Sequence, residues 1–223
     1  MKTKDRILLV SLEQFNEHGE RNVSTNKIAA AANISPGNLY YHFKNKQDII
    51  FCLFEAYEQR IKDCLKLPEG RDISLADKGA YLRDTFEGLW SYRFFHRDME
   101  HLIDSDERLR AQFQQMFRRS FDQIADIYRA LNQVGIIRAN ETEIRDLTLN
   151  SWMVVTSWFS FLRSHMLSDQ DQLISKALAQ QGIYQVFSLE RPYLTEQYRD
   201  QLQQLMQPLQ MELPWLTNPT KAR

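Results

Sequence analysis

The residues with the clearest chemistry lie between positions 23 and 46. Ser35 and Pro36 open a short segment that continues with Gly37 and Asn38. Serine favours the N-cap of a helix and proline its first position, so we expect a helix to start here. The unpaired N–H groups and the dipole at such an end attract phosphate oxygens, and the small side chains permit a close approach.

Polar side chains follow this helix start at short spacing. Tyr40, Tyr41 and His42 can donate hydrogen bonds to phosphates, although Tyr41 has a second interpretation, in which it packs against the first helix. Lys46 lies at the start of the next predicted helix, where its ammonium and the helix dipole both favour an anion. Asn38 carries an amide that can pair with adenine in the major groove. This set of residue types indicates nucleic-acid binding.

Two short helices position these side chains. The first is capped by Ser24 or Thr25 and extends to about Ala32, and its alanines let another helix cross it closely. Asn33 favours the left-handed conformation that ends a helix. The second helix covers about residues 36–43, so the pair predicts a helix-turn-helix.

A further helix completes the N-terminal head. Apolar residues at helical spacing predict it over residues 3–18, capped by Thr3 and ended by Gly19. Leu39 and Phe43, four positions apart, are the predicted core edge of the helix that carries the polar side chains.

The charge distribution agrees with one anion-binding end. The formal net charge of the 223 residues is −1, yet the first 50 hold seven basic residues against five acidic ones. No carboxylate occurs from residue 21 to residue 47, which gives a locally basic head on an acidic body. If the lysines of this stretch form one exposed surface, DNA binding is favoured.

The pattern of the remaining residues also predicts helices, so the predicted fold class is all-α. Asn45 caps a connecting helix over about residues 46–67. We divide the chain into a head of residues 1–47, this connector, and a larger helical domain of residues 68–223. The expected helices of that domain cover residues 74–97, 105–134, 142–167, 170–190 and 194–207.

Several classes of protein are excluded by what the sequence lacks. No apolar run approaches the length of a membrane span, so we expect a cytoplasmic protein. Cys52 and Cys64 fall on a helical stretch and are predicted to be buried free thiols. No nucleophile–base motif or phosphate loop occurs, so we expect no enzyme and no cofactor. We name no metal site either, although polar residues cluster at His96, Asp98, Glu100, His101 and Asp104.

The run of residues 35–46 resembles the recognition helix and following turn of TetR-family transcriptional regulators. Residues 25–29 and the amphipathic start through Phe15 and Gly19 are similar to the same family, so the resemblance covers about the first 50 residues. It implies a homodimer whose two heads bind a near-palindromic operator in double-stranded DNA. Members mostly repress transcription and release DNA when a small molecule enters the C-terminal domain.

The resemblance also assigns roles to residues. Phosphate-contacting positions of the family match Thr25, Tyr40, His42 and Lys46. Groove-facing positions match Asn26, Ser35, Pro36, Gly37, Asn38 and Tyr41. Some relatives place a charged side chain where this sequence has Ser35 to Gly37, so base recognition depends here on Asn26, Asn38, Tyr41 and backbone shape.

The C-terminal domain is expected to hold the effector and the dimer interface. Aromatic side chains can line an apolar pocket, and the predicted lining is Trp90, Phe94, Phe113, Phe117 and Trp152, with ordinary core packing as the alternative. Arg118 or Arg119 could anchor an acidic ligand or simply lie on the surface. Helices near residues 143–166 and 170–190 are the dimerisation candidates, unless their apolar faces are buried within one chain.

One rival function comes from another class. A helical protein that binds small molecules or acts as a scaffold would use the same fold without DNA binding.

Overall fold

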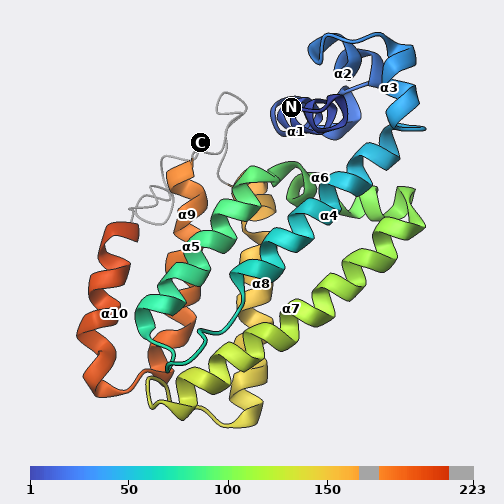
Figure 1. Ribbon diagram of the computed structural model, residues 1–223. Helices are drawn as coiled ribbons and strands as arrows, with labels where there is room; N and C mark the ends of the chain where they lie inside the picture. Colours follow the sequence, from blue (N-terminus) through green and yellow to red (C-terminus); the bar gives the residue numbers. More distant parts are fainter. Residues whose placement is uncertain (166–175, 211–223) are drawn as a thin grey trace, which may run out of the picture. The chain divides into compact units, whose positions relative to one another are not determined.

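The structure is a computed structural model that describes residues 1–165 and 176–210, and Figure 1 shows that this part of the chain is helical. Its only extended pairing within these ranges is an isolated antiparallel bridge between Ile137 and Leu194. The prediction of an all-α fold is therefore confirmed. The helices are α1 (Thr3–His18), α2 (Thr25–Ala31), α3 (Pro36–His42), α4 (Lys46–Cys64), α5 (Leu75–Ser91), α6 (Arg93–Ser105), α7 (Glu107–Gln133), α8 (Glu141–His165), α9 (Lys176–Glu190) and α10 (Arg199–Met206), with short 3-10 turns η1 (Glu20–Asn22), η2 (Arg191–Tyr193), η3 (Glu196–Tyr198) and η4 (Gln207–Leu209).

The chain forms two compact units. Unit 1 comprises Met1–Asp63 and Ser91–Arg119, and unit 2 comprises Cys64–Trp90 and the described part of Ser120–Arg223. Helix α7 therefore contributes its first half to unit 1 and its second half to unit 2. No helix among the described residues combines the length and the hydropathy that crossing a bilayer requires.

The local signals of the head operate as the sequence predicts. Ser24 is the N-cap of α2, where its side chain accepts a hydrogen bond from the Lys27 amide at 3.3 Å. Asn33 adopts a positive φ of 52° after α2, and Ser35 caps α3 by accepting from the Asn38 amide at 3.2 Å. The two helices of the helix-turn-helix therefore have locally determined starts and a locally determined turn between them.

The core of unit 1 forms where α1, α2, α3 and α4 meet. Leu39 and Phe43 are buried as predicted, although α3 ends one residue before Phe43. Asn45 caps α4, because its side-chain oxygen accepts a hydrogen bond from the Asp48 amide at 2.8 Å.

The predicted cap of α1 was wrong. Lys2 is the N-cap and makes no capping hydrogen bond with its side chain, and Thr3 is the first helical residue.

One helix that the sequence predicts is divided into two helices in the structure. The sequence indicated continuous helix over residues 74–97, but the helix breaks at Tyr92, between α5 and α6. Asn16 of α1 stabilises the break, since its Nδ2 donates to the Ser91 carbonyl at 2.8 Å and its Oδ1 accepts from the Phe94 amide at 3.1 Å. Phe94 is fully buried and packs on Phe15 with ring centroids 5.2 Å apart, so α6 lies against α1 in unit 1.

The other helices agree with the prediction to within a few residues where they are described. The predicted helices over residues 105–134 and 142–167 correspond to α7 and to α8 as far as residue 165. The predicted helix 170–190 corresponds to α9 from residue 176, and its first residues lie outside the described ranges. The predicted helix 194–207 begins later, because η3 precedes α10.

Unit 2 is held by close packing of α8 on α9 and by a buried polar network. Lys78 Nζ lies 2.9 Å from Glu190 Oε1, and both side chains are only 5% exposed. Tyr128 donates to Glu190 at 2.5 Å and its hydroxyl lies 2.6 Å from Ser151 Oγ. Burial and the neighbouring Glu190 carboxylate raise the pKa of Tyr128 well above its usual value, which keeps the phenol protonated as a donor.

The two cysteines form no disulfide and are half-buried rather than buried, so that prediction was right about the thiols and wrong about their exposure. Burial is the main cause that raises the pKa of Cys52.

Candidate nucleic-acid interface

The predicted DNA-facing residues come together on α2, α3 and the start of α4. Their side chains project from a head in which Leu39 anchors α3 from the opposite side, at 0% exposure. The exposed members are Asn26, Ser35, Pro36, Gly37, Asn38, Tyr40 and Tyr41, and the half-buried members are Thr25, His42 and Lys46.

Tyr41 is the most exposed large aromatic residue of this surface, at 84%. Its ring contacts His42 edge-on, with centroids 5.1 Å apart. The alternative in which Tyr41 packs against the first helix is therefore not what the structure shows. A solvent-exposed aromatic ring that has no core role is available for a partner surface.

Thr25 and Tyr40 are joined directly. The Thr25 Oγ1 and Tyr40 hydroxyl oxygens lie 2.9 Å apart, at hydrogen-bonding distance across α2 and α3. Both residues remain partly accessible, since Tyr40 is 50% exposed and Thr25 is half-buried. Each hydroxyl has one donor and two acceptor positions, so the pair can hold the two helices together and still bind a phosphate oxygen.

Lys46 occupies a different environment from the other predicted residues. Its ammonium lies 2.6 Å from Glu20 Oε1 and donates to the carbonyls of Glu20 at 3.1 Å and Val23 at 3.2 Å. The Lys46 side chain is 22% exposed and that of Glu20 only 5%. An ammonium has three N–H donors, so these partners use its full donor capacity.

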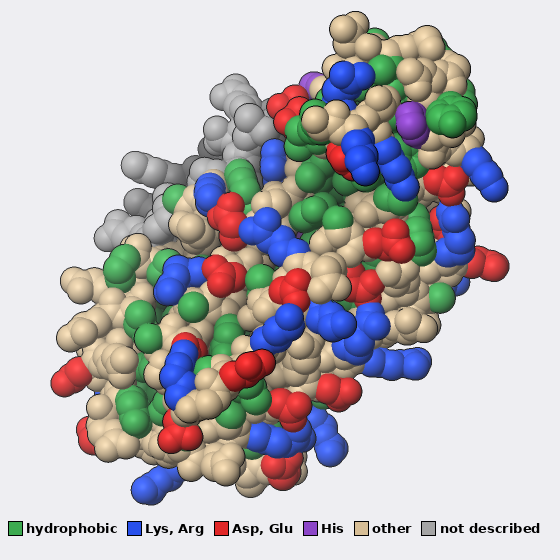
Figure 2. Space-filling view, viewed as in Figure 1, with side chains coloured by type: hydrophobic (Ala, Val, Ile, Leu, Met, Phe, Trp, Pro, Cys, Tyr) green, Lys and Arg blue, Asp and Glu red, His purple; other side chains and the backbone are tan. Residues whose placement is uncertain are grey.

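Three other basic side chains of the carboxylate-free stretch lie on the surface of the head. Arg21, Lys27 and Lys44 are exposed, and Lys27 Nζ donates to the Asn22 carbonyl at 2.9 Å. Figure 2 shows Lys and Arg side chains gathered around a histidine at the upper right of the view. The lysines of the carboxylate-free stretch are thus on the surface apart from Lys46, whose charge is paired with Glu20.

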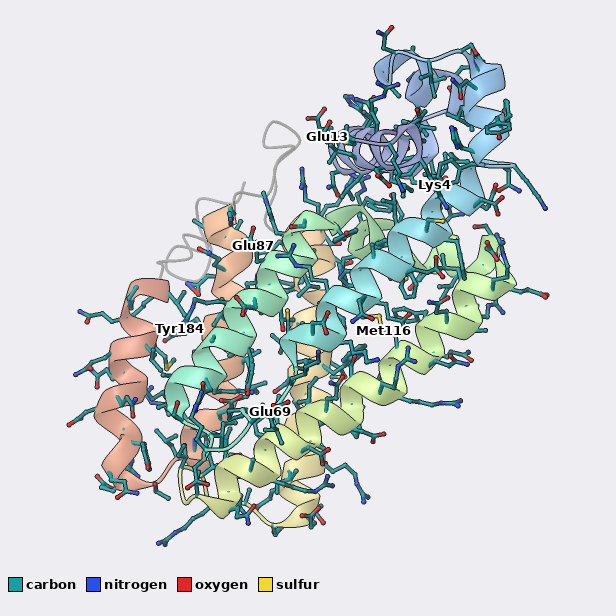
Figure 3. The ribbon with its side chains drawn as sticks, viewed as in Figure 1. Lys4, Glu13, Glu69, Glu87, Met116 and Tyr184 are labelled. Carbon is teal, nitrogen blue, oxygen red and sulfur yellow. The ribbon has the colours of Figure 1, made fainter. Side chains whose placement is uncertain are left out.

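One basic residue beside α3 was not predicted. Lys4 of α1, labelled in Figure 3, places its Nζ 5.6 Å from the centroid of the Phe43 ring, directly after α3. Because Lys4 and Phe43 lie far apart in sequence, no local pattern could have signalled this contact. The signal that was available is only the basic character of the N-terminal residues.

The predicted ligand-lining residues divide between the two units. In unit 1, Phe94 belongs to the core, Phe113 is half-buried with its ring 6.2 Å from that of Phe54, and Phe117 is half-buried. In unit 2, Trp90 and Trp152 are half-buried, and the Trp90 ring lies 6.3 Å from that of Phe159.

The polar residues that we considered as ligand anchors or metal ligands include some that interact with another side chain and some that are exposed. Arg119 pairs with Glu58 and Arg118 is exposed. His96 is buried, with Nε2 2.9 Å from the Tyr57 hydroxyl. Within residues 1–165 and 176–210, no group of three or more His, Cys, Asp or Glu residues is arranged to hold a metal ion.

Comparison with known proteins identifies this arrangement. The profile described as "Bacterial regulatory proteins, tetR family" matches residues 7–52, which contain the helix-turn-helix. The profile described as "Bacterial transcriptional repressor" matches residues 56–202. The chain belongs to the TetR family. It is a DNA-binding transcriptional regulator, and its α2–α3 pair is the family's helix-turn-helix.

Individual TetR-family proteins resemble the chain to different extents. A regulator from Marinobacter aquaeolei VT8 is 47% identical, with a TM-score of 0.87, over 95% of this chain and 100% of that chain. The transcriptional regulators AcrR of Shigella flexneri and QacR of Staphylococcus aureus are each 37% identical over 60 residues, 27% of this chain. These matches span only 28% and 32% of the lengths of AcrR and QacR.

Proposed function

We propose that this TetR-family protein is a homodimeric repressor that leaves a near-palindromic operator when a small molecule binds its C-terminal helical domain. In this proposal residues 1–47 form the DNA-binding head, residues of about 46–67 the connector, and residues 68–223 the ligand-binding and dimerisation domain. It acts in the cytoplasm and has no enzymatic activity.

The observation that carries the DNA-binding part is the exposed face of α3. Its N-terminal turn offers small and polar side chains, and Tyr41 projects from it at 84% exposure without a packing role. We assign phosphate contacts to Thr25, Tyr40 and His42, and groove contacts to Asn26, Ser35, Pro36, Gly37, Asn38 and Tyr41. Lys46, whose ammonium is bonded within the head, is left out of this set.

Dimerisation is assigned to α8 and α9. On α8, Leu149 is 44% exposed and Met153 52% exposed, one helical turn apart on the same side. Two such helices from each subunit would form a four-helix bundle about a two-fold axis. The two heads then need to reach half-sites spaced by about 34–36 Å, one turn of DNA.

Effector binding is assigned to aromatic residues of the C-terminal domain. Trp90 and Trp152 of unit 2 are candidates, and Phe113 and Phe117 of unit 1 are separate ones, while Phe94 is left out because it belongs to the core of unit 1. A ligand acts by favouring the form of the dimer whose heads do not fit the operator. Inverting the occupancy from 99:1 to 1:99 requires a differential affinity of about 5.5 kcal/mol between the two forms.

The test begins with selection of bound sequences from random double-stranded DNA by the purified full chain. A palindromic consensus is expected, and failure to enrich any sequence would refute the proposal in favour of a helical protein that does not bind DNA. Against the selected operator, Asn38→Ala should weaken binding by about tenfold, since a base contact contributes roughly 1–3 kcal/mol. The matched control is Gln114→Ala, which removes an exposed amide from α7 and should leave the affinity unchanged.

A further inference from the structure

The Lys46 side chain connects the residues before and after the helix-turn-helix by hydrogen bonds. Val23 stands immediately before the N-cap of α2, and Lys46 is the first residue of α4. The bond from Lys46 Nζ to the Val23 carbonyl therefore closes a loop that contains the whole of α2, the turn and α3. The bond to the Glu20 carbonyl fixes η1 to the same point.

The Lys46 ammonium also forms an ion pair with the carboxylate of Glu20, which is buried. The residue is 4% exposed, and its Oε1 lies 2.6 Å from the Lys46 ammonium. Its second oxygen, Oε2, accepts no hydrogen bond from the described residues and lies 3.7 Å from His101 Nε2 of α6. If Lys46 turned toward a phosphate, a carboxylate would be left buried without its main partner, which is strongly unfavourable.

We propose that Lys46 and Glu20 are positioning residues that set the orientation of the recognition helix, and that the Lys46 ammonium does not contact a DNA phosphate. The inference rests on the proposed DNA binding by α3. The pair fixes the entry to α2 and the exit from α3, so loosening it changes how α3 meets the groove. It leaves the number of phosphate charges neutralised by the head unchanged.

The two roles of Lys46 predict different salt dependence. Log K falls as log salt rises, and each lost phosphate contact makes this slope less steep by about 0.9. A positioning role leaves this slope as it is in the unaltered chain. The slope is the change of log K with log salt. A smaller folded fraction that is the same at every salt concentration scales the apparent affinity by one factor throughout, so it does not change the slope.

The experiment measures operator affinity at several salt concentrations for the full chain and for Glu20→Gln, which retains the Lys46 ammonium. We expect Glu20→Gln to weaken operator binding by about tenfold, the scale of one charge-assisted hydrogen bond, with an unchanged slope. Affinity for random DNA should fall much less, because phosphate contacts remain. If Lys46 is instead a phosphate ligand restrained by Glu20, the variant releases it, and tighter binding with a steeper slope would overturn the inference.

Lys46→Met tests the same pair from the other side, because methionine retains an unbranched apolar stem and removes the charge. An unchanged slope with weaker operator binding supports the positioning role, and partial recovery of affinity in Glu20→Gln/Lys46→Met supports it further. A slope reduced by about 0.9 per head, or unchanged operator affinity, would overturn it. Lys44→Met is the matched control on the same turn, since Lys44 is exposed, and it leaves the Glu20 pair intact. Absence of DNA binding by the unaltered chain is a different result, which refutes the proposed function itself.

Discussion

Replacing Gly182 of α9 by alanine should destabilise the protein, although alanine is the better helix former. A Cβ atom built at Gly182 would lie 2.4 Å from two ring carbons of Phe86 on α5 and 2.9 Å from Trp158 on α8. Ordinary van der Waals contact begins at 3.4 Å, so the rings would have to move by about 1 Å. Phe86 is 2% exposed and Trp158 is 8% exposed and bonded to the Leu178 carbonyl, so neither ring has free space to move into.

The magnitude follows from two opposing effects. Overpacking of this kind destabilises a protein by about 1–3 kcal/mol. Replacing a mid-helix glycine by alanine stabilises the helix by about 1 kcal/mol. We therefore expect Gly182→Ala to lower the free energy of unfolding by up to about 2 kcal/mol. Gly79 of α5 is the matched control, because its Cβ would meet only the flexible end of Arg83 at 3.1 Å and Leu205 at 3.7 Å.

Urea denaturation at one fixed protein concentration, followed by tryptophan fluorescence and by circular dichroism, measures both variants. The concentration must be fixed because dimerisation contributes to the stability of a dimer. Gly79→Ala should equal or exceed the parent chain in stability, and Gly182→Ala should fall below it. Equal stability of the two variants would show that α5, α8 and α9 are not packed as closely as the structure has them.

Other predictions concern single polar contacts. Ser35→Ala removes the cap of α3 and should destabilise the head by about 1 kcal/mol, seen as faster hydrogen exchange of the α3 amides. Hydrogen bonds from Arg71 hold the pKa of Asp77 well below its ordinary value of about 4, so this carboxylate stabilises the fold above that pH and loses its effect as the pH falls further. In acid titrations monitored by circular dichroism, Asp77→Asn should therefore flatten the acid limb of the stability curve. Tyr128→Phe deprives Glu190 of a buried donor and should lower the free energy of unfolding by about 1–3 kcal/mol in denaturant titration; an unaltered midpoint would contradict the network.

The head could be predicted from sequence because its signals are local. Ser35, Pro36 and Asn33 act on backbone groups within a few residues of themselves, so residue type and spacing are sufficient. Apolar spacing likewise predicted the burial of Leu39 and Phe43. The family's helix-turn-helix is thus readable from the chain before any tertiary contact is known.

The contacts that sequence reasoning missed depend on distant residues. Nothing near Tyr92 signals the end of α5, because the side chain that satisfies the freed backbone groups belongs to Asn16. The predicted phosphate role of Lys46 took no account of Glu20, whose carboxylate meets Lys46 of α4 and His101 of α6 only in the folded head. The division of α7 between the two units has no local marker either.

The corner between α5 and α6 has a consequence for how the sequence can diverge. Asn16 supplies a donor to one helix end and an acceptor to the other from a single short amide. Aspartate would lack the donor, leucine would lack both, and glutamine would reach one methylene too far. A lineage that loses this asparagine must therefore satisfy the Ser91 carbonyl and the Phe94 amide in another way, because these are backbone groups that are present whatever residues occupy positions 91 and 94.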